Sequence, residues 1–467
     1  MSGAGPGYGP TDRGIALRIW PLLGAAALGL VPFTVYSNFL VDITRDSGAS
    51  SALMGWLRGT GGVAALAVGL CCAPLLDRMS RRAAAAAALA VIGAACALGV
   101  LGTVWSWAGF CLLVGAGTTV LNPAVSAMAA DRFRDPATSG RAATQVSATM
   151  TLTAVLAAPL LAGPALLWGW RGDLAATAVL AVAVAVLLGR RDDGGLRHRG
   201  PAAPGTGSGQ HALSGPGSET PGPGRARATA SGTEVVGSVS PGANRRPLST
   251  PSPDAVPIGY AGALRVALGL PGVPGMLLVS VLRTTAFMGQ LAYLAVLYSD
   301  RFQVGPGIFS LVWALSGITF FLGNWFGGRL LRSLTHSRHT AWTAAFAVLV
   351  GAAAVLVLFA TSRLATALAA TAALGAAHAV TAAAVTTLLV RGSEGHRGTV
   401  LAFNGAGQSL GVCMGASVAG AGRALGGWTG AGVGLALVTV LAAVVAAHVA
   451  FSLRGRTDGA GRGKVVS

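Results

Sequence analysis

Charged residues are scarce in this 467-residue sequence. Charged residues make up only 10% and hydrophobic residues 53%, whereas a soluble domain carries about 25% charged residues. A chain this long with so little charge lacks the polar surface that keeps a folded protein in water. Apolar runs of about 20 residues, each able to cross about 30 Å of hydrocarbon as a helix, recur along almost the whole chain. The composition therefore predicts a polytopic membrane protein.

Lysine and cysteine are also rare. Lys464 is the only lysine among 33 basic residues, and the net charge of +18 comes from arginines in the polar gaps between apolar runs. Arginines in such gaps set membrane topology, so this charge does not indicate nucleic-acid binding. The five cysteines lie inside apolar runs without metal-ligand spacing, which predicts small buried side chains. We expect no metal and no cofactor.

The apolar runs form two groups of six. Residues 20–189 and 259–453 each hold six predicted spans, and residues 190–258 between them are dense in Gly, Pro, Ser and Arg. That composition cannot bury enough apolar surface to offset the entropy of ordering, so we expect a disordered linker. Residues 1–19 and 454–467 are predicted tails. The predicted fold class is all-α integral membrane, with twelve transmembrane helices in two six-helix bundles.

The positions of the basic residues predict the orientation. With the N-terminus inside, the inner segments carry 26 lysine and arginine residues and the outer loops carry five. Both termini and the linker are therefore predicted to be cytoplasmic, in a multi-pass protein of the inner (plasma) membrane.

The two groups of spans also look duplicated. An offset of 258 residues aligns three residues of the first group with identical residues of the second: Asp42 with Asp300, Gly140 with Gly398 and Trp170 with Trp428. Parallel repeats of six helices are known in membrane transporters.

One polar loop carries a recognisable motif. After the second predicted span the chain reads Ala73-Pro74-Leu75-Leu76-Asp77-Arg78-Met79-Ser80-Arg81-Arg82. This resembles the Gly-x-Leu-x-Asp-Arg-x-x-Arg-Arg signature of the major facilitator superfamily, with Ala in place of the opening Gly. A decayed copy lies at 323–332, and Gly169-Trp170-Arg171 and Arg397-Gly398-Thr399 resemble the drug and sugar efflux branch. The resemblance implies a secondary transporter with alternating access, and most closely a proton antiporter.

The charges of this loop suggest a gate. Asp77 could lie at the N-terminal dipole of a neighbouring helix, while Arg78, Arg81 and Arg82 pair across the cytoplasmic gap. Such contacts would exist only when the two halves close there, so they would bias the equilibrium between inward and outward states. The alternative is a positive cluster that only sets topology.

Few ionisable residues lie within the predicted spans. None of the 15 acids is deep in a span, whereas Arg58, Arg283, His378 and His448 are. A charge in hydrocarbon costs about 2.5–3.5 kcal/mol on insertion scales, so it normally faces a cavity or a partner. Arg283 is predicted near the midplane. Arg58 is predicted closer to the outer surface, where its side chain could snorkel.

In the family fold, helices one, four, seven and ten line a central cavity. The resemblance therefore implies a substrate cavity lined by five polar residues: Arg283, Gln290, His378, Asn38 and Asn122. The alternatives are hydrogen bonds from Arg283 to backbone carbonyls and a helix–helix hydrogen bond for His378. Because no carboxylate lies at this depth, we expect a positive or neutral cavity and an electron-rich substrate.

The leading functional hypothesis is proton-coupled export of a small amphipathic organic molecule by a monomer in the lipid bilayer. The proton-coupling candidates are His378, Asp42 and Asp300. An importer or uniporter on the same fold is the main alternative. A multi-span membrane enzyme is a distant alternative, because the short outer loops carry only isolated charges and no catalytic cluster.

Overall fold

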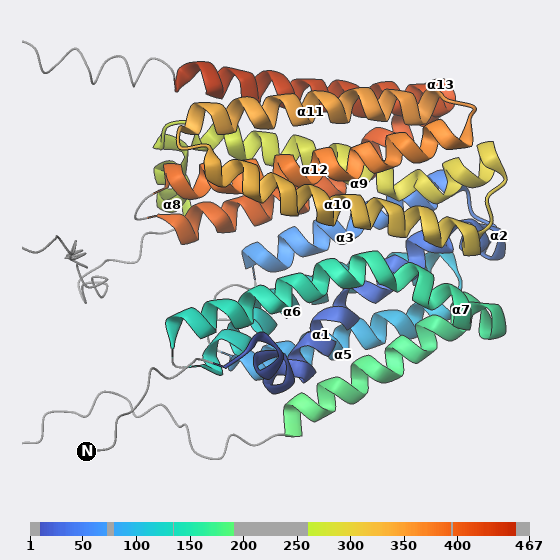
Figure 1. Cartoon of the computed structure of the whole chain (residues 1–467). Coiled ribbons are helices and arrows are strands. Elements are labelled where there is room, and N and C mark those ends of the chain that lie inside the picture. The colour runs from blue at the N-terminus through green and yellow to red at the C-terminus, as the bar shows by residue number, and fades with distance from the viewer. Residues whose placement is uncertain (1–9, 72–78, 134, 191–259, 394–395, 454–467) are drawn as a thin grey trace, which may run out of the picture. The chain divides into compact units, whose positions relative to one another are not determined.

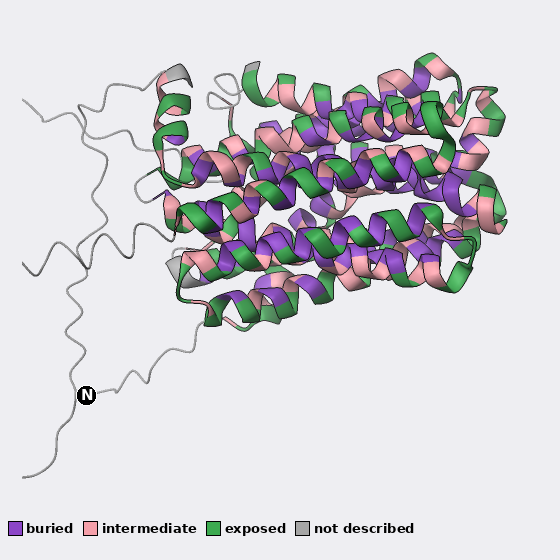
Figure 2. Cartoon of the chain, turned by 90° about the horizontal axis from the view of Figure 1, so that it is seen from above, coloured by how far each residue is buried: buried purple, intermediate pink, exposed green. Residues whose placement is uncertain are grey.

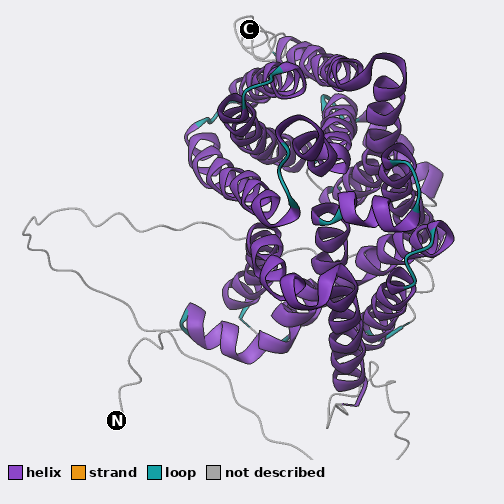
Figure 3. Ribbon diagram, turned by 90° about the vertical axis from the view of Figure 1, so that its right-hand side faces the viewer, coloured by secondary structure: helices purple, strands orange, loops and turns teal. Residues whose placement is uncertain are grey.

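The computed structural model describes residues 10–71, 79–133, 135–190, 260–393 and 396–453. The helices before and after the central gap form one unit, and the described residues contain no strand (Figure 3). The predicted linker at 190–258 lies outside the described residues apart from Arg190, as does the predicted tail at 454–467. The first half of the bundle comprises residues up to 190, and the second half comprises residues from 260.

Each half is a series of long helices joined by short turns (Figure 1). The first half consists of α1 (Asp12–Asn38), α2 (Leu40–Ser47), α3 (Ser51–Cys71), α5 (Arg81–Val100), α6 (Val104–Asp131) and α7 (Pro136–Arg190). The second half consists of α8 (Tyr260–Gly269), α9 (Val273–Phe302), α10 (Pro306–Ser333), α11 (Ser337–Ala360), α12 (Leu364–Gly392) and α13 (Arg397–Ser452). The short helix α8 directly precedes α9.

The first helix begins before the predicted span. The sequence predicts a tail over residues 1–19, whereas α1 starts at Asp12. Thr11 caps this helix, because its hydroxyl accepts a hydrogen bond from the backbone N–H of Gly14 at 3.3 Å. Such a cap satisfies one of the free N–H groups of the first turn. The helix can therefore begin at the polar residues Thr11 and Asp12, ahead of the apolar run.

Two helices are too long to cross a membrane once. The described residues contain 10 helices that are long and apolar enough to span, but α7 has 55 residues and α13 has 56. A straight helix of that length would extend about 80 Å. Instead α7 turns back at Gly169 (Figure 1), and the helical conformation of α13 is interrupted at Gly426 and Gly427. Each therefore supplies two spans, and the described residues contain the twelve predicted spans.

The two bends confirm the internal duplication in the backbone. Gly169 has a φ of 66° and Gly427 a φ of 60°, and the two glycines are separated by the predicted offset of 258 residues. Each precedes one of the matched tryptophans, Trp170 and Trp428. Residues with a side chain rarely adopt this left-handed conformation, so glycine at both positions lets each long segment reverse direction.

The helices carry hydrophobic side chains both on their buried faces and on their exposed faces. Figure 2 shows buried and exposed residues alternating along the same helices, yet many exposed side chains are large and hydrophobic. Trp105, Leu166, Leu167 and Leu425 are each at least 85% exposed. An exposed apolar surface of this extent indicates contact with lipid.

The bundle has two distinct ends. The end at which α1 begins and α13 finishes is called the terminal end, and the end at which α2 lies is called the opposite end (Figure 1). The sequence predicts that the terminal end faces the cytoplasm.

Candidate substrate cavity

Two adjoining cavities lie between the halves, in the middle of the bundle. The first, the aromatic cavity, has a volume of about 430 Å³ and is walled by α1, α3 and α7 from one half and α9, α10 and α13 from the other. Its lining includes four aromatic rings: Phe33, Phe287, Trp313 and Phe320. Phe287 and Phe320 stack with ring centroids 6.0 Å apart. Cavities of this size and composition are typical of sites for small organic ligands.

The second cavity, called the polar cavity, has six hydroxyl or amide side chains in its wall. It has a volume of about 270 Å³, and its hydroxyl and amide lining comes from α6, α9 and α13: Thr118, Thr119, Asn122, Thr284, Gln408 and Ser409. The aromatic and polar cavities share Phe33, Met288 and Val412 as wall residues. Together they offer an apolar chamber beside a hydrogen-bonding one.

Arg58 lies in the wall of the aromatic cavity. Its Nη1 donates hydrogen bonds to the hydroxyl of Ser37 and to the carbonyl oxygen of Leu291, the latter at 3.3 Å. The guanidinium lies 5.8 Å from the ring centroid of Phe33 and 6.0 Å from that of Trp313, within reach of cation–π attraction. The predicted snorkelling of Arg58 toward the surface is wrong, because the side chain points to the interior between the halves.

Arg283 and His378 are neighbours in the second half. Both are buried, with 8% and 5% exposure, and Arg283 is close enough to His378 for a Coulombic interaction. The Arg283 Nη2 donates to the hydroxyl of Thr284 at 3.3 Å. The centroid of the His378 ring lies 4.3 Å from that of Phe287, a residue that lines the aromatic cavity. Neither side chain lines the aromatic or the polar cavity, so direct substrate contact by either stays a prediction.

The three predicted amide residues lie at different levels. Asn122 lines the polar cavity, Gln290 is fully buried in α9, and Asn38 lines a small cavity of about 110 Å³ at the opposite end. All three have buried side-chain polar atoms that lack a hydrogen-bond partner among the described residues. The Nε of Arg283 lacks one as well. Leaving such groups unpaired costs about 1–3 kcal/mol each. Buried polar groups of this kind are usually satisfied by a protein group, a water molecule or a ligand.

Only part of the predicted gating motif can be placed. Asp77 and Arg78 lie outside the described residues. Arg81, at the start of α5, forms an ion pair with Asp131 at the end of α6, so its partner belongs to the same half. Arg82 also has an interaction partner. The predicted pairing of these arginines across the gap is untested.

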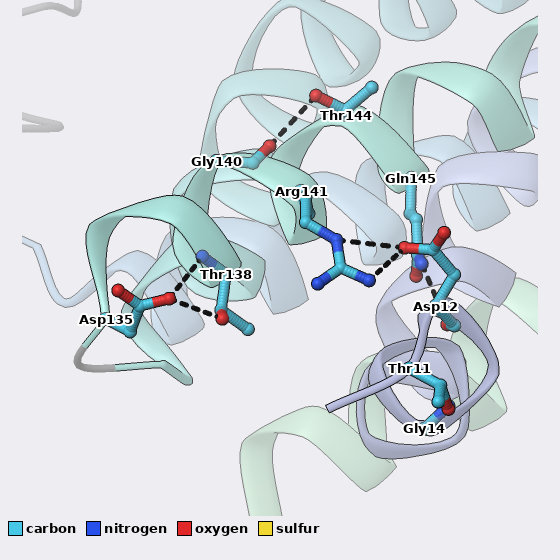
Figure 4. A network of polar contacts seen from close by, with 9 residues as sticks. All are labelled: Thr11, Asp12, Gly14, Asp135, Thr138, Gly140, Arg141, Thr144 and Gln145. Carbon is cyan, nitrogen blue, oxygen red and sulfur yellow. Dashed lines mark hydrogen bonds and ion pairs between the residues drawn. The ribbon is translucent and has the colours of Figure 1, made fainter. Parts of the chain in front are cut away.

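Polar contacts at the terminal end join helices of the same half (Figure 4). Arg141 of α7 donates to a carboxylate oxygen of Asp12 through Nε at 3.0 Å and Nη2 at 2.6 Å. Gln145 donates to the backbone carbonyl of Asp12 at 2.8 Å, so α7 holds the start of α1. In the second half, Arg391 donates to the carbonyl oxygen of Leu334 at 3.1 Å.

Side-chain contacts that join the two halves lie toward the opposite end. Arg423 of α13 donates to the hydroxyl of Ser51 at 2.5 Å, and Tyr293 of α9 donates to the carbonyl oxygen of Ala52 at 3.0 Å. The bond from Arg58 to the Leu291 carbonyl also crosses the halves. All three use the first eight residues of α3. The halves are therefore closed on the opposite-end side of the cavities.

The two matched acids also lie at the opposite end. Asp42 lines the small cavity and pairs with Arg45 at 3.2 Å, while Asp300 pairs with Arg423 at 3.2 Å. Burial raises the pKa of Asp42, Arg45 opposes that change, and the nearby Asp46 adds to it. Of the predicted proton-coupling candidates, Asp42 is thus held in a setting that favours its neutral form.

Comparison with known proteins identifies the family. The sequence model described as the Major Facilitator Superfamily matches residues 22–393. The chain belongs to this superfamily. No curated protein matches the chain.

Several solved structures share the fold. A bacterial homolog of the human lysosomal transporter Spinster, inward-facing and unoccupied, is similar with a TM-score of 0.65 and 16% identity, over 96% of this chain and 98% of that one. Its occupied inward-facing form gives a TM-score of 0.63 at 16% identity, covering 97% and 98%. A mutant of the nucleoside transporter NupG gives 0.63 at 11% identity, covering 94% and 99%. These similarities show the fold, and the efflux branch stays a prediction.

Sequence reasoning missed the aromatic cavity. The position of Arg58 along the chain indicates how deep the residue lies in the membrane, but not the direction in which its side chain points. A signal was present in α3, where Gly55, Gly59 and Gly62 recur every three or four residues and mark a face that packs closely on another helix. Arg58 lies beside that face, which places it at the junction of the halves.

Proposed function

We propose that the protein is a proton-coupled exporter of a small amphipathic organic molecule. The observation that carries this proposal is the pair of adjoining cavities, one aromatic and one polar, walled by both halves and closed toward the opposite end. A site shared by two halves changes its access when the halves rock against each other. An apolar chamber beside a polar one suits a substrate with both characters.

The proposed orientation places the terminal end in the cytoplasm. The excess of basic residues in the segments predicted to be inside supports this orientation. The cavities would then load from the cytoplasm, which is the direction an exporter requires. In this proposal the protein is a plasma-membrane monomer, and residues 190–258 form a cytoplasmic linker between the bundles at 20–189 and 259–453.

Coupling to protons is assigned to the three predicted candidates. Asp42 is favoured by its setting, because a carboxyl whose pKa is raised by burial can exchange a proton nearer to neutral pH. Asp300 is paired with Arg423, and His378 is buried beside Arg283. Asp77, Arg78, Arg81 and Arg82 are proposed to gate the terminal end when the halves close there.

The test is uptake into everted membrane vesicles that contain the full-length protein. An imposed gradient with an acidic lumen should drive accumulation of compounds from an amphipathic panel, and a protonophore should abolish it. Vesicles without the protein are the control. Uptake that equilibrates without a gradient would indicate a uniporter, and accumulation only in right-side-out vesicles would indicate an importer.

A further inference from the structure

Arg58 has unused hydrogen-bonding capacity. A guanidinium carries five N–H donors, and both protein bonds of Arg58 use Nη1. No described residue accepts a hydrogen bond from its Nε or Nη2. Because Arg58 belongs to the wall of the aromatic cavity, these donors are available to a molecule bound there.

The positive charge of Arg58 is also unpaired by any described carboxylate. The acids nearest the opposite end pair with other arginines: Asp42 with Arg45, Asp46 with Arg171 and Asp300 with Arg423. In a medium of low dielectric an unpaired guanidinium attracts anions strongly and repels cations. Its planar fork matches a carboxylate or a phosphate in a bidentate arrangement.

The rest of the cavity favours a flat apolar body. The rings of Phe33 and Trp313 lie nearest to the guanidinium, and the stacked pair of Phe287 and Phe320 lines the same chamber. Aromatic rings pack best on other flat rings, in stacked or edge-to-face arrangements. A volume of about 430 Å³ accommodates a ligand of a few fused rings.

We propose that Arg58 binds the anionic group of the transported molecule and that the aromatic cavity holds its ring-bearing body. The substrate class is therefore an amphipathic aromatic anion, such as an aromatic carboxylate. This inference rests on the proposed function, since it assigns a ligand to the same cavity. It transfers the anion contact predicted for Arg283 to Arg58, because Arg283 lies outside the wall of that cavity.

Binding at Arg58 also connects the ligand to closure of the halves. The guanidinium joins Ser37 of the first half to the Leu291 carbonyl of the second, and the latter bond is long at 3.3 Å. An anion that engages the guanidinium competes with this bond. Substrate would then weaken one of the three hydrogen bonds that close the opposite end and shift the equilibrium toward its opening.

The experiment compares naphthoate with its neutral amide, naphthamide, by calorimetric titration of the purified full-length protein in lipid nanodiscs. Empty nanodiscs provide the blank for partition into lipid. We expect naphthoate to bind about tenfold or more tightly than naphthamide, the ratio expected for one charge-assisted hydrogen-bonded contact. Arg58→Gln should reduce the ratio to within about twofold. Arg58→Lys, which keeps the charge with fewer donors, should give an intermediate ratio.

The matched control is Arg332→Gln, which removes an exposed arginine near the end of α10 and should keep the ratio. Size-exclusion profiles establish that each variant is folded, and the comparison of the two ligands on the wild-type protein needs no variant. A wild-type ratio near one, no saturable naphthoate binding, or a full ratio in folded Arg58→Gln would overturn the proposal. Loss of the ratio in Arg283→Gln alone would place the anion at Arg283 instead. Naphthoate preference without proton-driven transport would reject the proposed export and leave this anion site standing.

Discussion

The two ends of the bundle are held together differently. Ion pairs join residues of one half at both ends, such as Arg141–Asp12 at the terminal end and Arg171–Asp46 at the opposite end. From Gly62 toward the opposite end, α3 of the first half also packs directly on α13 of the second. Glycine allows this contact, because a Cβ at Gly62 would lie 2.5 Å from the carbonyl oxygen of Ser409 and 2.7 Å from the nitrogen of Cys413. Close backbone packing therefore closes one end, while salt bridges stabilise each half separately.

Gly62→Ala is expected to have the largest effect on closure of the halves at the opposite end. The added methyl group cannot fit against backbone atoms of the other half, and overpacking of this kind costs about 1–3 kcal/mol. We expect the population closed at the opposite end to fall by about tenfold. The measurement is the alkylation rate of Ala295→Cys, a buried position in the small cavity, with an impermeant maleimide after the native cysteines are replaced.

Gly69→Ala is the matched control for this substitution. It lies on the same helix toward the terminal end, where a Cβ would meet only the Thr119 methyl group at 3.8 Å, an ordinary contact. Its alkylation rate should equal that of the parent. Equal rates for Gly62→Ala and Gly69→Ala would show that contact between α3 and α13 does not close the opposite end.

A smaller effect is expected from Tyr293→Phe. This change removes the hydrogen bond to the Ala52 carbonyl at 3.0 Å, which crosses the halves and is worth about 1 kcal/mol. The alkylation rate at position 295 should rise about fivefold. Tyr298→Phe loses a comparable bond, to Thr371 at 2.8 Å, within the second half. It should lower thermal stability without changing that rate, and a rise for both variants would contradict the special role of Tyr293.

The smallest effect is expected on the pH dependence of thermal stability, through Asp42 at the opposite end. Burial raises the pKa of Asp42, so the folded protein keeps this proton at a higher pH than the unfolded chain does. Stability from this group is greatest when it is protonated, and it falls as pH rises from about 4 toward the raised pKa. Asp42→Asn should reduce the loss of Tm between pH 4 and pH 7 by on the order of 1 °C. An unchanged pH dependence in differential scanning fluorimetry would contradict this role.

Hydropathy and glycine content predict most of the fold, because both act locally along the chain. The apolar runs locate the spans, and the recurring Gly-Trp pair marks the two bends that make twelve spans from ten helices. The placement of Arg283 and His378 around one centre is implied by the resemblance to the family fold. The direction of Arg58 does not follow, because it depends on how closely α3 approaches the second half.

The candidate site is harder to predict than the spans for the same reason. Phe33, Phe287, Trp313 and Phe320 come from α1, α9 and α10, and each is an ordinary residue of an apolar helix in the sequence. Only the packing of the two halves brings these rings around one cavity. The resemblance to the family fold implies a cavity role for Asn38, Asn122 and Gln290, but their separate levels depend on tertiary structure.

The central claim is that the two halves are closed at the opposite end and not at the terminal end. It is tested most directly by measuring the distance between the halves at both ends. Spin labels at Arg45 and Gln303, which line the same small cavity, report the opposite end, and labels at the exposed Arg18 and Arg332 report the terminal end. Pulsed dipolar spectroscopy of the full-length protein in nanodiscs should give a short, narrow distribution for the first pair and a longer one for the second. Gly62→Ala should lengthen the first distance and shorten the second. A long first distance in the unsubstituted protein, or movement of both distances in the same direction, would contradict alternating closure of the two ends.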